Sequence, residues 1–291
     1  MKNIILYLNG DRGIKVLETL IKINKYNVFV FSLKKIVFPY KLAEDIIVYK
    51  LIKNINDKKH ILNIKNINPY LSIVAGFPQI FNEELINLPD FGTINLHAGP
   101  LPKYRGGSPL NWQIINGEDQ IGLSIIQMAK GIDTGDIIYK SSFKLDLLDN
   151  IKSVHNYANK LFSNMVIKVL EQIESKSQVV IKQDSHDSIY WHQRSDLDGR
   201  INWEKMTALQ VYNFIRALTK PYPGAYTFFS EYKLRIFLAE LTNEKFYGTP
   251  GRVVKIKKNK LLVICADKGL YIKKYKFEKY SGDLKNGMQL K

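Results

Sequence analysis

The spacing of hydrophobic residues changes once along the chain, and this change limits the folds that the chain can adopt. The first half has short apolar runs separated by segments long enough for a helix, at Lys2–Leu8, Val28–Leu33, Leu71–Ala75 and Gly92–His97. Such runs predict a mostly parallel sheet with helices on its faces. Beyond Pro221 apolar and polar residues alternate between turn signals, as antiparallel strands do. We therefore expect an α/β, Rossmann-like domain followed by a small antiparallel β barrel of the OB-like kind.

The two patterns meet in a polar, weakly periodic stretch of the chain. A long apolar-periodic helix over residues 154–173 precedes it, and a second helix over 207–218 comes after it. The sequence therefore predicts a catalytic domain over residues 1–185, a connection over 186–206, and a helix with the β barrel over 207–291.

The charge of the chain is strongly positive. Lysine and arginine number 43 against 27 acidic residues, a net charge of +16, and residues 251–291 hold twelve basic residues against three acidic ones. A basic surface attracts nucleic acid, acidic membranes or phosphorylated small molecules. A lysine-rich composition that only keeps the protein in solution explains the charge equally well, so charge alone does not identify a partner.

Several classes of protein are excluded by composition. The single cysteine, Cys265, rules out an internal disulfide framework and a multi-thiolate metal site. No apolar run approaches the roughly 20 residues that span a bilayer, and the N-terminal run ends at Asn9 without a leader-like pattern. The five histidines lack metal-ligand spacing. We expect a cytoplasmic protein that needs neither a metal nor a membrane.

The segment from Gly92 to Ile138 carries the chemistry. Its first strand ends in Asn95-Leu96-His97, and the two-residue repeat of a strand places Asn95 and His97 on one face at the carboxyl end, where α/β sheets bind ligands. An amide and an imidazole there supply an oxyanion donor and a group that handles protons. A lone Asn-x-His pair more often makes a local hydrogen bond, so the interpretation depends on the residues downstream of His97.

Two further features lie downstream of this strand. The loop over residues 99–107 is rich in proline and glycine and carries Lys103 and Arg105, which suits an anion. The turn from Gly131 to Asp136 presents carboxylates, and an aspartate that meets His97 would fix the orientation of its ring. The spacing alone leaves open whether Asp133 reaches His97.

Three motifs in this order resemble the formyltransferases that use 10-formyltetrahydrofolate. They are Asn95-Leu96-His97, Leu101-Pro102-Lys103-Tyr104-Arg105-Gly106, and Gly131-Ile132-Asp133-Thr134-Gly135-Asp136. The resemblance implies a catalytic trio of Asn95, His97 and Asp133, with 10-formyltetrahydrofolate as co-substrate and no metal. In the implied reaction a primary amine attacks the formyl carbon, Asn95 stabilises the oxyanion, and His97, oriented by Asp133, assists the oxyanion or accepts the amine proton.

The resemblance also implies a pocket for the pterin of the folate. Two loops line this pocket: the loop after the third predicted strand, and the turn that contains Asp133. The residues placed there are Phe77, Gln79, Ile80, Ile132, Thr134 and Gly135.

The acceptor of the formyl group has three alternatives: a nucleotide-linked amino sugar, methionyl initiator tRNA, or no acceptor in a non-catalytic relative. The basic charge favours tRNA. The intact trio argues against a non-catalytic relative. The runs Ser108–Trp112, Asn116–Glu118 and Arg194–Trp203 resemble those of the sugar N-formyltransferases and favour the sugar. We expect the amine of a dTDP-4-amino-4,6-dideoxyhexose used in surface polysaccharide (O-antigen) synthesis, with a 3-amino isomer or a UDP-linked amino sugar as alternatives. The resemblance also implies a homodimer formed by the smaller domain. The expected substrate contacts are Arg12, Lys103, Arg105, Gly106, Trp191 and Tyr222.

Overall fold

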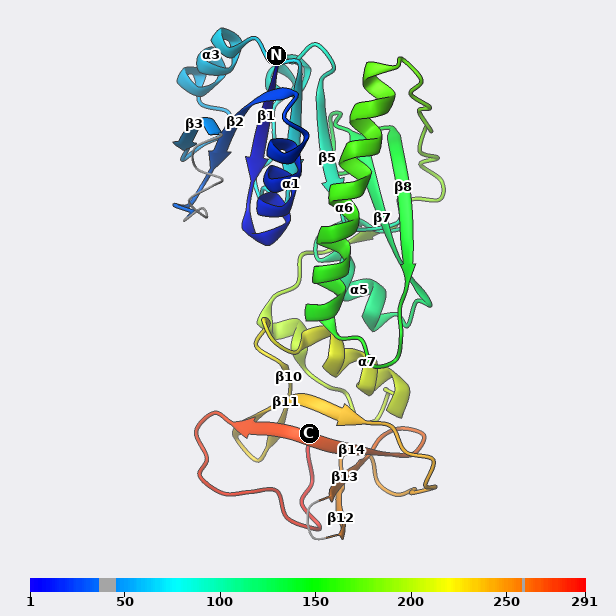
Figure 1. The fold of residues 1–291 in the computed structure, drawn as a ribbon. Helices are drawn as coiled ribbons and strands as arrows, with labels where there is room; N and C mark the ends of the chain where they lie inside the picture. The colour runs from blue at the N-terminus through cyan, green and yellow to red at the C-terminus, as the bar shows by residue number, and fades with distance from the viewer. Residues whose placement is uncertain (37–45, 258–259) are drawn as a thin grey trace. The chain divides into compact units, whose positions relative to one another are not determined.

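The structure is a computed structural model that describes residues 1–36, 46–257 and 260–291 (Figure 1). The chain divides into two compact units. The first unit contains residues 1–106, 122–143 and 156–190. The second contains residues 107–121, 144–155 and 191–291. The long helix α6 (Ile151–Glu174) contributes residues to both units.

The first unit is built on a seven-stranded sheet in the order β3-β2-β1-β4-β5-β7-β8. Its strands are β1 (Lys2–Leu8), β2 (Tyr26–Ser32), β3 (Ile46–Leu51), β4 (Leu71–Ala75), β5 (Thr93–His97), β7 (Gln120–Gln127) and β8 (Ile137–Lys144). Strands β1 to β5 pair in parallel, and β7 runs antiparallel to β5. The expected α/β architecture with a mostly parallel sheet is confirmed.

The central strands of this sheet, β1 and β4, are buried along most of their length. Residues 4–8 of β1 and all of β4 are buried, as expected for parallel strands covered on both faces. The helices of this unit are α1 (Gly10–Ile23), α3 (Lys58–Ile67) and α4 (Glu83–Asn87). Aspartate and asparagine caps start two of them, with Asp57 accepting from the amide of Lys59 and Asn82 from that of Leu85.

Helix α1 begins at Gly10, shortly after β1 ends at Leu8. Gly13 allows this close succession, because a Cβ there would lie 2.4 Å from the Cβ of Leu8. Without that atom, the start of α1 packs directly against the end of β1.

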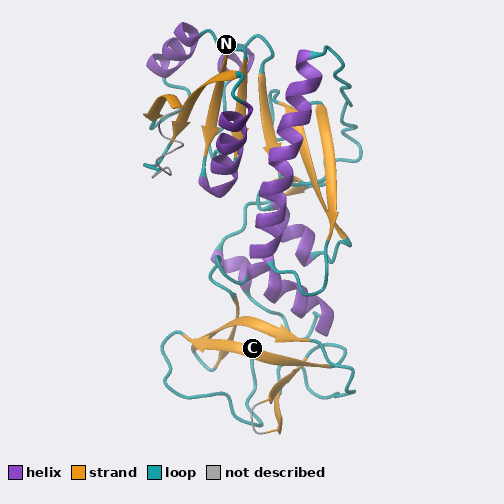
Figure 2. Ribbon diagram, in the orientation of Figure 1, coloured by secondary structure: helices purple, strands orange, loops and turns teal. Residues whose placement is uncertain are grey.

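The second unit holds a five-stranded antiparallel sheet in the order β10-β11-β14-β13-β12 (Figure 2). Its strands are β10 (Ala225–Phe229), β11 (Tyr232–Glu240), β12 (Val253–Lys257), β13 (Lys260–Ile264) and β14 (Gly269–Phe277). Its helices are α5 (Pro109–Ile115), the 3-10 turn η1 (Asp196–Gly199) and α7 (Ala208–Leu218). A capping box starts α7, because the side chains of Thr207 and Gln210 each accept from the other's backbone amide.

The C-terminal segment bonds to both edge strands of this sheet. Val253 in β12 exchanges backbone hydrogen bonds with Gly287 and Met288, and Phe228 in β10 exchanges two with Lys291. The segment therefore satisfies backbone groups on the two edges, which an open sheet would leave exposed. The expected antiparallel β domain is confirmed as a half-barrel sheet.

Candidate active site

Two of the three expected catalytic side chains come from the last residues of β5. His97 is the final residue of the strand and is 5% exposed, and Asn95, two residues earlier, is half-buried. Leu96 between them is buried. Asn95 and His97 both contact Asp133, so they share one face of the strand as the two-residue repeat predicts.

Both ring nitrogens of His97 face oxygen atoms. Nδ1 lies 3.3 Å from Oδ2 of Asp133, and Nε2 donates to the carbonyl of Tyr104 at 2.5 Å. A doubly protonated ring can donate to both oxygens, whereas a neutral ring can donate to only one. Gly99 makes the second contact possible, because a Cβ there would lie 2.9 Å from Nε2 of His97.

Asp133 sits at the tip of the turn between β7 and β8, with its backbone in the left-handed region at φ +52°. Its carboxylate also accepts from the amide of Gly106 at 2.9 Å and from Nδ2 of Asn95 at 3.4 Å. Burial opposes ionisation, but the hydrogen bond and charge of His97, the amide of Gly106 and the charge of Arg105 hold the pKa of Asp133 below its usual range. An ionised Asp133 can therefore orient the imidazole.

The two loops expected to bind the pterin lie side by side in the first unit. The first loop follows β4 and ends at Glu83, the first residue of α4. Lys130, in the loop after β7, pairs with Glu83 at 3.7 Å. Met128 packs against the aromatic core cluster that contains Phe77 and Phe81. The loops thus form one surface beside the trio's turn.

The individual residues of these loops play different parts. Ile80 and Ile132 are 75% and 54% exposed, so they offer apolar surface to a ligand. Phe77 is buried in the core cluster. The amide of Gln79 donates to the carbonyl of Lys53 and accepts from the amide of Ile55, so it ties its loop to the preceding segment.

Thr134 and Gly135 shape the Asp133 turn itself. The hydroxyl of Thr134 donates to the carbonyl of Lys130 across the turn. A Cβ on Gly135 would lie 1.7 Å from the carbonyl oxygen of Gln127, so only glycine fits there.

The basic residues expected to bind substrate differ in orientation. Arg105 is 4% exposed, and its guanidinium donates to Gln183 and to the hydroxyl of Tyr190, within the protein. Arg12 is half-buried in α1 and donates to the carbonyl of Leu96 at 3.0 Å, which places it beside the catalytic strand. Lys103 is exposed on the loop after β5.

Trp191 and Tyr222 lie in the second unit. Trp191 packs on Trp112 with ring centroids 4.8 Å apart, and the guanidinium of Arg194 lies 4.8 Å from the centre of the Trp112 ring. The hydroxyl of Tyr222 lies 3.1 Å from Nε2 of His155. Arg194 and Tyr222 also line a cavity of about 250 Å3 in this unit.

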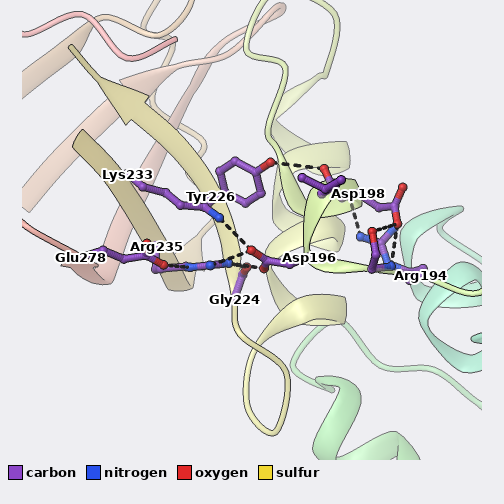
Figure 3. A network of polar contacts seen from close by, with 10 residues as sticks. Arg194, Asp196, Asp198, Gly224, Tyr226, Lys233, Arg235 and Glu278 are labelled. Atoms are coloured by element: carbon purple, nitrogen blue, oxygen red, sulfur yellow. Dashed lines mark hydrogen bonds and ion pairs between the residues drawn. The ribbon is translucent and has the colours of Figure 1, made fainter. Parts of the chain in front are cut away.

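A polar network fixes one wall of this cavity (Figure 3). Asp196 accepts from Arg235 and Lys233, and Arg235 also donates to Glu278. Arg194 donates to the carbonyl of Asp198 at 2.6 Å. The segment from Arg194 to Gly199 is therefore tied within itself and anchored at Asp196 to strand β11.

Two contributors to the site were not predicted from the sequence. The carbonyl of Tyr104 is a backbone group, and nothing in the residue pattern indicates that it faces His97. Gln183 lies in the polar stretch after α6, where no periodicity marks it, yet its amide contacts both the Asp133 turn and Arg105. A glutamine in a polar stretch carries no sequence signal of its own.

Two features are absent from residues 1–36, 46–257 and 260–291, the part of the chain that the structure describes. No group of three or more His, Cys, Asp or Glu side chains among these residues could hold a metal ion. No helix among them is both long and apolar enough to span a bilayer.

Both parts of the chain match known protein families. Residues 21–170 match the family described as "Formyl transferase", and residues 195–282 match "Formyl transferase, C-terminal domain". A methionyl-tRNA formyltransferase of Caldanaerobacter subterraneus subsp. tengcongensis is 36% identical over 208 residues, which cover 72% of this chain and 66% of the relative. The chain thus spans about two thirds of the length of such curated relatives.

Solved structures share the fold. The methionyl-tRNA formyltransferase from Clostridium thermocellum superposes with a TM-score of 0.63 at 25% identity, over 84% of this chain and 96% of that one. An N-formyltransferase from Helicobacter canadensis, solved with folinic acid and dTDP-3-aminofucose, gives a TM-score of 0.70 at 22% identity. That match covers 94% of this chain and 98% of the other.

Proposed function

Because the chain belongs to the formyl transferase family, we propose that it moves a formyl group from 10-formyltetrahydrofolate to the amine of a nucleotide-linked amino sugar. The family and the class of enzyme expected from the three motifs are confirmed. The observation that carries the proposed chemistry is the convergence of Asn95, His97 and Asp133, from two separate segments, within hydrogen-bonding reach of one another.

The three side chains divide the work of acyl transfer. Asn95 is only half-buried, and its amide can donate to the oxyanion that develops when an amine attacks a formyl carbon. His97 stands beside it with the Asp133 carboxylate at Nδ1, so that nitrogen carries the proton that it donates to Asp133. A cationic His97 stabilises the same oxyanion, and its neutral form accepts the proton that the attacking amine must lose.

The first unit has features that fit a folate. The two adjacent loops present Ile80 and Ile132, apolar side chains that a flat heterocycle can cover, next to backbone groups of the Asp133 turn. When bound, 10-formyltetrahydrofolate supplies the activated formyl group. Two side chains anchor the loop after β4. Phe77 packs in the aromatic core cluster, and the Gln79 side chain bonds to the backbone of Lys53 and Ile55.

The second unit has features that fit a nucleotide. A nucleobase can stack on an aromatic ring such as Trp191, and a pyrophosphate pairs with guanidinium groups such as that of Arg194. The nearby cavity lined by Arg194 and Tyr222 has the dimensions of a small-molecule group rather than of a nucleic-acid helix. These features support a nucleotide sugar as the acceptor. We propose that the protein acts in the cytoplasm, as a homodimer, in the synthesis of surface polysaccharide.

Methionyl initiator tRNA is the second candidate acceptor. Its support is specific, because relatives that are 33% to 36% identical to this chain are methionyl-tRNA formyltransferases. The net charge of +16 is also what a protein that binds tRNA needs.

An acceptor panel separates the two candidates. The purified protein is given 10-formyltetrahydrofolate with dTDP-linked 4-amino and 3-amino sugars, a UDP-linked amino sugar, or charged initiator tRNA, and formylated product is measured by mass spectrometry. We expect formylation of a dTDP-linked amino sugar, at a rate ~10²–10³-fold lower with the His97→Ala protein. Formylation of tRNA alone would replace the sugar by tRNA, and no formylation of any acceptor would refute the proposed reaction.

A further inference from the structure

The polar stretch after α6 contributes one side chain to the surroundings of the catalytic trio. The amide of Gln183 donates to the carbonyls of Asp133 at 2.8 Å and Gly135 at 2.6 Å. Its oxygen accepts from Nε and Nη2 of Arg105, at 3.0 and 2.9 Å. We propose that Gln183 is a positioning residue, which holds the Asp133 turn against the Arg105 loop so that the trio keeps its geometry. This inference rests on the proposed formyl transfer.

The hydrogen-bonding capacity of Gln183 is fully used. A glutamine amide offers two N–H donors and two acceptor sites on its oxygen, and all four have partners here. The donors can only face the two carbonyls and the oxygen can only face the guanidinium, so the amide has one orientation. The side chain therefore fixes the distance between two segments of the chain.

The contacts form a closed circuit through the catalytic aspartate. Gln183 holds the backbone carbonyl of Asp133, and Arg105 joins Gln183 to Gly106, whose amide donates to the Asp133 carboxylate. The backbone of Asp133 is in the left-handed region, which residues other than glycine adopt uncommonly. A turn with such a conformation keeps its shape only where surrounding bonds hold it, and the circuit provides them.

The same circuit explains why Arg105 points into the protein. Its three bonded nitrogens go to Gln183 and to the hydroxyl of Tyr190, and the residue is 4% exposed. In this position the guanidinium contributes to the charge that keeps Asp133 ionised. Arg105 thus acts on catalysis through Asp133, and Gln183 keeps it there.

No other standard side chain of this length can replace Gln183. A glutamate could accept from Arg105, but its second oxygen would face the carbonyls of Asp133 and Gly135 without a proton to share. A methionine has the length and neither set of bonds. The matched pair Gln183→Glu and Gln183→Met is therefore as informative as removal of the side chain.

The test compares these variants with a glutamine of the same segment. Gln183→Ala, Gln183→Glu and Gln183→Met are assayed with the acceptor that the panel identifies, alongside Gln178→Ala as the control. We expect kcat to fall about 10²-fold in all three, since misplacing catalytic groups by about 1 Å costs that much, while KM for both substrates stays near the wild-type value. Gln178→Ala keeps the wild-type kcat.

A pH profile separates positioning from a general loss of folded protein. Freeing Arg105 removes one of the influences that lower the pKa of Asp133, so that pKa rises in Gln183→Ala. The form with Asp133 ionised exists above its pKa, and the acid limb of the kcat profile therefore moves to higher pH. A smaller fraction of folded enzyme would lower the profile without moving it.

Each outcome decides the proposal. A lowered kcat in the Glu and Met variants with a shifted acid limb supports it, even if the Ala variant does not fold. Gln183→Glu with the kcat and pH profile of the wild type overturns it while the proposed reaction stands. A wild-type protein that formylates no acceptor overturns the proposed reaction and this inference with it.

Discussion

Two aspartates in the two units show how the same side chain is used in different ways. Asp133 in the first unit and Asp196 in the second both have a pKa below the usual range. The side chain of Asp133 is 12% exposed and its partners are His97, the amide of Gly106 and Asn95. The Asp196 side chain is 41% exposed, and its partners are Arg235 and Lys233 (Figure 3).

The difference lies in what the partners can do. Arg235 and Lys233 keep their charge at physiological pH, so hydrogen bonds from Arg235 and then from Lys233 lower the pKa of Asp196 and nothing in the network exchanges a proton. His97 can gain and lose a proton, and the contact of Asn95 with Asp133 is long at 3.4 Å. A carboxylate held by fixed cations stabilises structure, whereas one held by an imidazole and a loosely bound amide can take part in chemistry.

The largest expected effect comes from changing Asp133 or either of the side chains that contact its carboxylate. Asp133→Asn, His97→Ala and Asn95→Ala should each lower kcat by ~10²–10³, the usual cost of losing a group that stabilises a transition state. Formylation of the identified acceptor under saturating conditions measures this. Asp119→Asn, an exposed aspartate of the second unit, is the matched control. Wild-type kcat in the His97 variant would remove His97 from the mechanism.

Most of the framework was predictable because it depends on local patterns. The buried run of β1, the alternation before the five-stranded sheet and the two-residue repeat at Asn95 and His97 each fix which face a side chain takes. These patterns depend on the period of a strand and need no knowledge of the rest of the fold. The sequence does not predict the contact of Asp133 with His97, because it joins residues 36 positions apart through a turn whose direction the sequence does not fix.

The features that could not be predicted depend on backbone groups and on the satisfaction of polar atoms. Arg105 was expected to bind an anion, yet it is buried, with Gln183 and Tyr190 as partners. A sequence gives the charge of an arginine and not the direction of its side chain. The role of Gln183 can be recognised only from the positions of the four atoms that it contacts.

A smaller effect is expected from crowding the imidazole. In Gly99→Ala the new Cβ would lie 2.9 Å from Nε2 of His97 and 2.8 Å from the Cβ of Tyr104, so the contact between His97 and the Tyr104 carbonyl must lengthen. We expect kcat to fall about 10- to 10²-fold, as measured by steady-state formylation. Gly122→Ala is the control, because its Cβ would crowd Pro100 of the same loop at 2.6 Å, and the three atoms nearest to it all belong to Pro100. Equal losses in both variants would argue against a special role for the His97 contact.

The smallest effect concerns the carboxylate held by fixed cations and appears in stability. Because the pKa of Asp196 is lowered in the folded protein, its network stabilises the fold above the unfolded pKa of about 3.9, and this contribution is lost as pH falls through the folded pKa. Asp196→Asn should lower the free energy of unfolding by about 1 kcal/mol at pH 7, a modest value because the aspartate is partly exposed. Urea unfolding at pH 7 and pH 3 measures the gap between variant and wild type, which should narrow at pH 3. Asp119→Asn should leave stability unchanged at both values, and a gap for Asp196→Asn that is the same at both would show that its charge does not act through Arg235 and Lys233.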